Sequence, residues 1–178
     1  MEEVKQWRNF QLGEEIYDLS HLNAHSVEYV DTRNSEQIIT YRFLVTYSCH
    51  CFTKDEPSLN EDEREQLMYH APKESRPFNF ERYELSKKLP QIINSLAQPH
   101  ILIRHAGHGR FATVKISDRM GNEVEYYVFF TVFKEKNKLR IHVVSAYLTP
   151  DGLGKVKKIG FFTIAHNVLH NKPCKIPP

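Results

Sequence analysis

The 178-residue chain has only three cysteines, and two of them, Cys49 and Cys51, lie two positions apart. An odd number with this spacing is not the pattern of a disulfide framework, so we expect reduced thiols. Long apolar runs are absent too. No run approaches the roughly 20 residues of a membrane-spanning helix, and the start MEEVKQWRNF has no apolar secretory core. These absences predict a cytosolic protein with no membrane partner.

Charge of one sign is not in large excess, because the formal net charge is +2. The distribution is nevertheless uneven. Residues 55–65 are acidic, whereas 100–119 and 152–178 hold most of the surplus of His, Lys and Arg. This asymmetry favours an anionic partner near the C-terminal half.

The length fits one domain, residues 1–178. We divide it into an N-terminal segment with a β-hairpin (1–53), an acidic, proline-containing surface connection (54–78), a helix plus sheet (79–149) and a basic C-terminal tail (150–178). The hairpin has strand-like runs at 27–30 and 38–53 around the turn DTRNSEQ.

Residues 79–97 repeat apolar side chains near helical spacing, with a break expected before Pro90. Four β-like runs follow, at 100–105, 111–117, 123–134 and 138–148, and the turns between them contain Gly or Asn. The predicted fold class is therefore α+β: an N-terminal β-hairpin, a central helix and a four-stranded antiparallel meander. A short helix is expected at 161–169, in the tail.

One face of this predicted meander gathers polar residues. If the turns are centred on Met120 and near Lys136, three adjacent strands bring together Thr113, Lys115, Glu125, Tyr127, Ser145 and Tyr147. A solvated sheet face with a Lys115–Glu125 cross-strand pair explains this cluster as well as a site does. These six side chains share a face only if both assumed registers are right.

The loop RHAGHGRF before the second of these strands favours a site. It carries Arg104, His105, His108 and Arg110 around two glycines. Imidazole groups beside a phosphate suit metal-independent RNA cleavage, in which a base activates the 2′-hydroxyl and an acid protonates the leaving oxygen. Lys and Arg would stabilise the charge that develops on the phosphate.

The helix, the histidine-containing hairpin and the closing strand VVSAYL together resemble the barnase–EndoU–colicin–RelE group of ribonucleases and bacterial toxins, over about residues 79–149. The resemblance implies a metal-independent endoribonuclease that needs no cofactor, with RNA as substrate and an antitoxin or target protein as a possible partner. It makes His105 or His108 the catalytic histidine, Lys115 or Arg104 a phosphate ligand, and Ser145 and Tyr147 polar members of the last strand. From the polar face and the loop we expect Glu125 or a loop histidine as the base and the other as the acid. The candidate catalytic residues are therefore His105, His108, Glu125, Lys115 and Tyr147, and the candidate substrate-binding residues are Arg104, Arg110, Thr113, Tyr127 and Ser145.

Two other functions stay open. The first is a non-catalytic interaction module that docks through an aromatic sheet face formed by Phe111, Phe129, Phe133, Ile141 and Val143. The second is nucleic-acid binding without cleavage.

The stretch SCHCFT suggests a metal site, because Cys49, His50 and Cys51 are ligand types close together. Strand alternation argues against it, since it puts both cysteines in the core and points His50 the other way. A further ligand would also be needed, such as His70 or Cys174. We therefore expect no metal.

Overall fold

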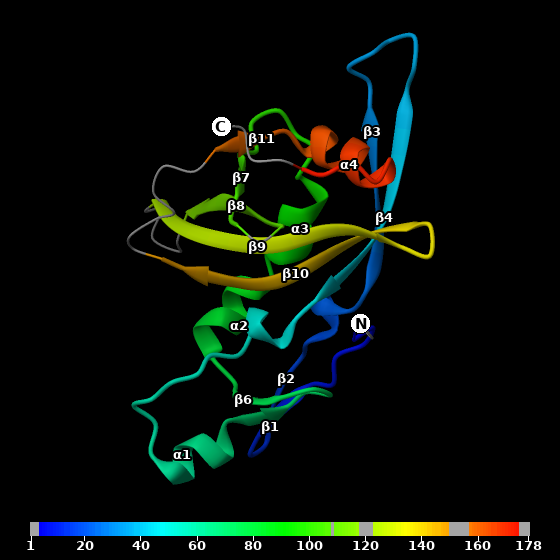
Figure 1. The fold of residues 1–178 in the computed structure, drawn as a ribbon. Coiled ribbons are helices and arrows are strands. Elements are labelled where there is room, and N and C mark those ends of the chain that lie inside the picture. Colours follow the sequence, from blue (N-terminus) through cyan, green and yellow to red (C-terminus); the bar gives the residue numbers. More distant parts are fainter. Residues whose placement is uncertain (1–3, 108, 118–122, 150–156, 175–178) are drawn as a thin grey trace.

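The computed structural model describes residues 4–107, 109–117, 123–149 and 157–174. Within these residues its centre is a mixed sheet of seven strands in the order β11-β7-β8-β9-β10-β4-β3 (Figure 1). Strands β10 and β4 run parallel, and the other neighbours are antiparallel. Their bounds are β3 (His25–Asp31), β4 (Ile39–Tyr47), β7 (Ile103–His105), β8 (Arg110–Ser117), β9 (Glu123–Glu135), β10 (Lys138–Leu148) and β11 (Lys158–Ile159).

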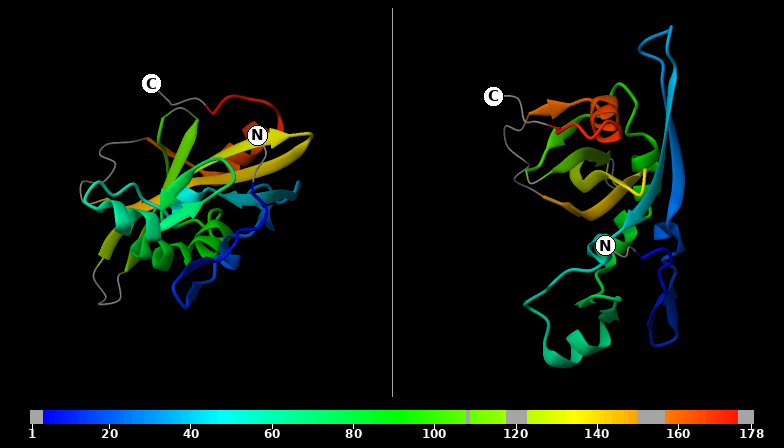
Figure 2. Two further views of the ribbon diagram at one scale, coloured as in Figure 1. Left: turned by 90° about the horizontal axis from the view of Figure 1, so that it is seen from below. Right: turned by 45° about the vertical axis from the view of Figure 1, so that its right-hand side comes forward.

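The predicted α+β class with a four-stranded antiparallel meander is wrong, because the predicted strands belong to this larger mixed sheet. Strand β10 joins the N-terminal hairpin through β4, with Ile141 opposite Val45. Both of these side chains are fully buried. An exposed edge on β10 would leave a row of unpaired backbone groups, and pairing with β4 removes that edge. Figure 2 shows the sheet curling around the helices on its inner side.

The N-terminal hairpin is present as predicted, with β3 antiparallel to β4 and Val27 opposite Phe43. The predicted turn between β9 and β10 is also confirmed. Lys136 and Asn137 both have positive φ, 47° and 61°. Positive φ at both central residues is the signature of a type I′ turn, whose twist matches that of the two strands.

The predicted central helix is divided where Pro90 requires it, into α2 (Phe80–Ser86) and α3 (Leu89–Asn94). Pro90 lies in the first turn of α3, where its missing N–H costs nothing. The predicted tail helix is α4 (Phe161–Leu169). Tyr29 of β3 joins α3 and α4 to the sheet. Its hydroxyl donates to the carbonyl of Ile93 in α3, and its ring packs on Phe161 of α4. None of the described helices is long and apolar enough to cross a membrane.

A smaller unit, in the lower half of Figure 1, surrounds a second aromatic cluster. It contains β1 (Phe10–Leu12), β2 (Glu15–Tyr17), the 3-10 helices η1 (Ser20–Leu22) and η2 (Cys49–Cys51), α1 (Glu61–Gln66), β5 (Met68–His70) and β6 (Ser75–Pro77). Trp7 and Tyr69 meet the ring of Phe52 at 5.1 and 4.9 Å, and Phe10 stacks on Phe78 at 4.2 Å. The predicted surface connection 54–78 thus contains a helix and a β-hairpin, and the hairpin was not predicted.

Candidate functional site

The strand register separates the polar cluster predicted on the meander. Val114, and not Thr113, lies opposite Tyr127, so the register between β8 and β9 differs by one residue from the assumed one. A shift of one residue moves side chains to the other face of the sheet. The hydroxyl of Thr113 donates to the carbonyl of Leu102 at 3.1 Å, and its side chain is buried. The register therefore puts the Thr113 side chain on the opposite face of the sheet from that of Tyr127.

Part of the cluster does assemble between β9 and β10. Tyr127 lies opposite Tyr147, and Ser145 lies opposite Phe129. The Tyr127 hydroxyl donates to the carboxylate of the exposed Glu125. Tyr147 lies over the guanidinium of Arg82, whose Cζ is 5.2 Å from the ring centroid. These contacts are between protein groups and do not bring a histidine to the tyrosines.

The predicted loop residues are placed differently. His105 is buried beside Phe111, with ring centroids 5.6 Å apart, and its Nε2 has no hydrogen-bond partner among the described residues. Arg104 pairs with Lys158 in the backbone register of β7 and β11. Arg110 is exposed at the start of β8. His108 and the side chain of Lys115 lie outside the described residues.

The aromatic docking face that would serve an interaction module is largely covered. Phe111 is 3% exposed, and Ile141 and Val143 are fully buried. Phe129 and Phe133 are only partly buried. The predicted contact surface is thus part of the core at three of its five positions.

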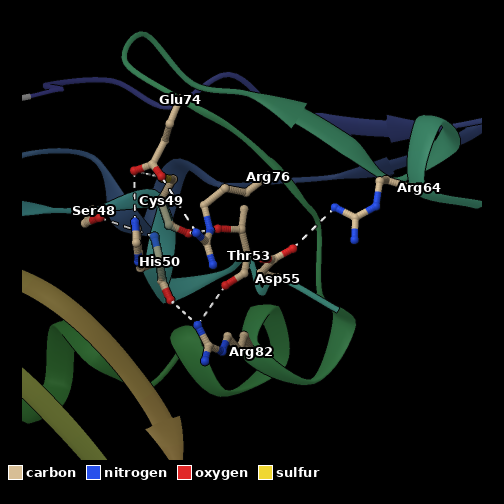
Figure 3. A network of polar contacts seen from close by, with 9 residues as sticks. All are labelled: Ser48, Cys49, His50, Thr53, Asp55, Arg64, Glu74, Arg76 and Arg82. Atoms are coloured by element: carbon tan, nitrogen blue, oxygen red, sulfur yellow. Dashed lines mark hydrogen bonds and ion pairs between the residues drawn. The ribbon is translucent and has the colours of Figure 1, made fainter. Parts of the chain in front are cut away.

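A different cluster, built by Cys49, His50 and Glu74, has the composition of a metal site (Figure 3). One ligand atom from each residue lies within 4.8 Å of the other two. His50 Nε2 is 2.9 Å from Glu74 Oε1, and Cys49 Sγ is 3.3 Å from the same oxygen. We call this group the Cys–His–Glu cluster. Cys49 is buried, whereas about a third of the His50 side chain remains exposed, so the cluster is reachable from solvent.

The local fold explains how two neighbouring residues can point to one carboxylate. Strand β4 ends at Tyr47, and Ser48 then caps η2 by accepting a hydrogen bond from the His50 N–H. In a 3-10 helix, successive side chains do not alternate between two faces as they do in a strand. Glu74 comes from the β5–β6 hairpin, where the Ala71 N–H donates to the Glu74 carbonyl at 2.9 Å.

Arg82 of α2 holds this short helix in place from below (Figure 3). Its Nη1 donates to the carbonyls of His50, at 3.0 Å, and Thr53, at 2.8 Å. Burial lowers the pKa of the Arg82 guanidinium. Arg82 is therefore a positioning residue for the Cys–His–Glu cluster, because its bonds fix the backbone that carries two of the three members.

The protonation states in the cluster are set by burial and hydrogen bonds. Burial, together with the hydrogen bond to Glu74, raises the pKa of the Cys49 thiol to about 12. Burial acts to raise the pKa of Glu74 as well, but the hydrogen bonds from His50 and Cys49 outweigh it, and that pKa is lowered. At neutral pH the cluster thus combines a neutral thiol with an ionised carboxylate.

The strand predicted through Thr53 ends at Tyr47, and the 3-10 helix that replaces its last residues was not predicted. With strand alternation, His50 would have pointed away from Cys49. The suggested extra ligand was also wrong in position, because His70 bonds to Ser75 instead, with Nδ1 2.8 Å from Oγ. Cys49 and Cys51 are both buried in the core as predicted, with 4% and 0% exposed, and the error concerns the direction of His50. No local sequence signal connects Glu74 to residues 24 and 25 positions earlier.

A pocket of about 180 Å³ adjoins the cluster. Cys49 and Glu74 contribute to its wall, so it opens beside two of the three candidate ligands. The remaining wall is mostly apolar or aromatic and is formed by Val4, Trp7, Tyr47, Ser48, Ala71, Pro72, Lys73 and His142. This combination of an apolar cavity with a few convergent polar groups is typical of sites for small molecules.

Comparison with known proteins gives the class of the protein. The YjaZ family model matches residues 9–169, so the chain belongs to the YjaZ family. A relative in this family is Protein YjaZ of Escherichia coli (strain K12). It is 44% identical to this chain over 178 residues, which cover 99% of the chain and 98% of the relative. No solved structure matches the chain.

This membership corrects the resemblance to the barnase–EndoU–colicin–RelE group, which is wrong. The family match extends over both the N-terminal hairpin and the sheet, whereas the resemblance covered only about residues 79–149. Its motifs were short, and a helix before antiparallel strands occurs in many unrelated folds. The prediction that the chain is a toxin of that group depended on this resemblance and is therefore also wrong.

Proposed function

We propose that this protein binds a divalent metal ion of the zinc class through Cys49 Sγ, His50 Nε2 and a carboxylate oxygen of Glu74. The observation that carries the proposal is the convergence of these three ligand atoms, from two separate segments, within 4.8 Å of one another. Thiolate, imidazole and carboxylate are the three ligand types that zinc uses in proteins.

The number of ligands bears on what such a centre would do. Structural zinc sites use four protein ligands, whereas catalytic sites use three and leave one position for water or substrate. Among the described residues the cluster has three members, and the pocket lies beside two of them. Hydrolysis of a bound carbonyl or phosphoryl compound is the reaction class that this arrangement supports best.

The same residues could be considered as a cysteine nucleophile with a histidine base, but two observations oppose this. A nucleophilic cysteine requires a thiolate, and the pKa of Cys49 is raised to about 12. In addition, His50 Nε2 and Cys49 Sγ both contact the same Glu74 oxygen. In the contacts described, His50 is thus hydrogen-bonded to the carboxylate and not to the thiol, whereas a histidine base would have to contact the thiol.

A titration with zinc tests the proposal. Protein stripped with a chelator is titrated with zinc against a chromophoric competitor, and we expect one zinc ion per chain. Replacing His50 by Ala or Glu74 by Gln should weaken binding by at least about 100-fold, since each change removes a ligand. His70→Ala is the matched control, because His70 lies on the same hairpin and the hydrogen bond described for its side chain is to Ser75 and not to the cluster. Unchanged zinc affinity in Glu74→Gln would contradict the proposal.

The earlier functional predictions stay predictions. Cleavage or binding of RNA, and docking on an antitoxin or another protein, are not tested by the fold or by the family. The expected cytosolic location is part of the present proposal, and three free cysteines suit a reducing compartment. Cleavage of RNA in EDTA by the purified protein, lost in His105→Ala, would support the ribonuclease prediction over a metal centre.

A further inference from the structure

Two histidines, His166 and His170, lie one turn apart at the C-terminal end of α4. Their rings pack together, with centroids 4.2 Å apart and planes tilted by 33°. Helix α4 lies beside the N-terminal hairpin in Figure 1, and its Phe161 packs on Tyr29 of β3. His166 is half-buried and His170 is exposed. This histidine pair shares no residue with the Cys–His–Glu cluster, so it is a separate group of metal-ligand side chains.

The backbone puts both rings on one side of the helix, because residues four positions apart are neighbours on a helix surface. His170 follows the last residue of α4, but its N–H still donates to the carbonyl of His166 at 3.1 Å. The helical geometry therefore extends to His170. Asn171 then takes a positive φ, 53°, which ends the helix. The two imidazoles thus lie above each other on successive turns.

A hydrogen bond determines which nitrogen of His170 can bind a metal ion. Its Nδ1 is 2.8 Å from the carbonyl oxygen of His166. A carbonyl oxygen only accepts, so Nδ1 carries the proton, and Nε2 of the neutral ring keeps its lone pair. Metal-bound histidines are commonly oriented by this kind of bond to a backbone carbonyl. Among the described residues, no hydrogen bond involves the His166 ring and neither of its nitrogens is fully buried, so a metal ion can reach it from solvent.

The spacing of the rings suits binding of one ion by both residues. Metal–nitrogen bonds of about 2.1 Å place two ligand nitrogens at most about 4.2 Å apart, and rings with centroids 4.2 Å apart can each present one nitrogen to the same ion. Asp31 of β3 lies near His166, but both of its carboxylate oxygens bond to Arg33 at 2.8 Å, so it is not a third ligand. A site with imidazole ligands alone selects copper, nickel and zinc over magnesium, calcium and manganese.

We propose that His166 and His170 form a second metal site, which binds a divalent ion of the copper and nickel class through one imidazole nitrogen of each residue, Nε2 in His170. Water fills the other positions of the ion. Because the two nitrogens are held at this spacing only in the folded helix, the bound ion stabilises the last turn of α4. The inference does not depend on the proposed function, since the two sites have no residue in common.

The first test is a calorimetric titration with nickel(II) alone, because copper(II) would also oxidise free thiols. Full-length His50→Ala protein is used, so that the imidazole of the Cys–His–Glu cluster cannot contribute. We expect one nickel ion per chain. Adding His166→Ala or His170→Ala should weaken nickel binding about 100-fold, because chelation by two linked ligands is lost. Adding His100→Ala, which changes an exposed histidine outside the pair, should leave the affinity unchanged.

Absence of nickel binding in His50→Ala, or an affinity that survives His166→Ala or His170→Ala, would overturn the inference. Neither outcome bears on the zinc titration of the Cys–His–Glu cluster.

The second test locates the ion without changing either histidine. Nickel(II) is paramagnetic, so a substoichiometric amount should broaden the imidazole C–H NMR signals of His166 and His170 before those of the other histidines. Manganese(II) is also paramagnetic but prefers oxygen ligands, so it should not broaden these two signals selectively. Selective broadening of other histidines by nickel would overturn the site, and equal selective broadening by manganese would overturn its preference for metals that bind imidazole.

Discussion

Zinc binding by the Cys–His–Glu cluster should release a proton from Cys49, and the apparent affinity for zinc should therefore rise with pH. The reason is the raised pKa of this thiol, about 12, which results from burial and from its hydrogen bond to Glu74. Below that pKa the thiol carries its proton in the metal-free protein, but zinc is bound by the thiolate. Glu74, whose pKa is lowered, is already ionised near neutral pH and contributes no proton.

The size of the effect follows from proton counting. One proton released per zinc ion makes the apparent association constant rise about tenfold for each unit of pH, as long as the pH stays well below the pKa of Cys49. Between about pH 7.5 and about pH 8.5 the pH is well below the raised pKa of Cys49, so the slope in this range includes the proton released by the thiol.

The measurement is a competition titration with zinc at both pH values, corrected for the pH dependence of the competitor. Cys49→Ser should bind zinc weakly and lose most of the slope, because a serine hydroxyl does not form the anion that the thiol forms. Cys174→Ser is the matched control, since Cys174 is a free cysteine that is absent from the cluster. With cobalt in place of zinc, the thiolate-to-metal absorption band should appear in wild type and in the control, and be missing in Cys49→Ser.

A zinc affinity that is independent of pH in the wild-type protein would refute this reasoning, since it would mean that no thiol proton is displaced. Equal affinity and equal slope in Cys49→Ser would refute the assignment of Cys49 as a ligand. Loss of zinc binding in Cys174→Ser would place the metal elsewhere.

Three further changes test the supports of the site and the packing around it. Arg82→Gln removes the bonds to the carbonyls of His50 and Thr53 and should lower zinc affinity about tenfold. Arg64→Gln, which changes a partly buried arginine of α1 that bonds to Asp55 and Glu56, should not, and equal effects would contradict the positioning role. Phe52→Ala should lower the free energy of unfolding by about 4 kcal/mol in urea, because Phe52 is fully buried between aromatic rings; a loss below about 1 kcal/mol would show that the cluster is not tightly packed. Tyr126→Phe removes a buried hydroxyl without a partner among the described residues and should raise the free energy of unfolding by about 1 kcal/mol, so a clear decrease would reveal a missed partner.

Local sequence signals predicted those elements that depend on neighbouring residues. The break at Pro90 was predictable because proline lacks the N–H that a continuous helix needs. The β3–β4 hairpin and the helix at 161–169 were predictable from apolar periodicity and turn residues. In each case the residues that determine the element are only a few positions apart, so the local sequence is sufficient to predict it.

The register between strands was harder to predict from the sequence. The assumed register between β8 and β9 was one residue away from the observed one over Arg110 to Val114, and the pairing changes by one residue within each ladder, between Val114 and Ile116 and between Val143 and Ser145. An extra residue in one strand changes which side chains face each other, and no turn residue reports it. The predicted polar cluster assumed one constant register along each pair of strands. Because the register is not constant, its residues do not all lie together on one face.

The sequence by itself determined the turns before β4 and before β10, the divided helix and most of the described strands, because each of these rests on the conformational preferences of adjacent residues; the predicted turn at Met120 lies outside the described residues. Only the tertiary structure decided the parallel pairing of β10 with β4 and the meeting of Glu74 with Cys49 and His50. Both join segments that are far apart in the chain. Their partners are selected by burial of whole surfaces and by closure of a sheet edge, and these free energies depend on the assembled molecule.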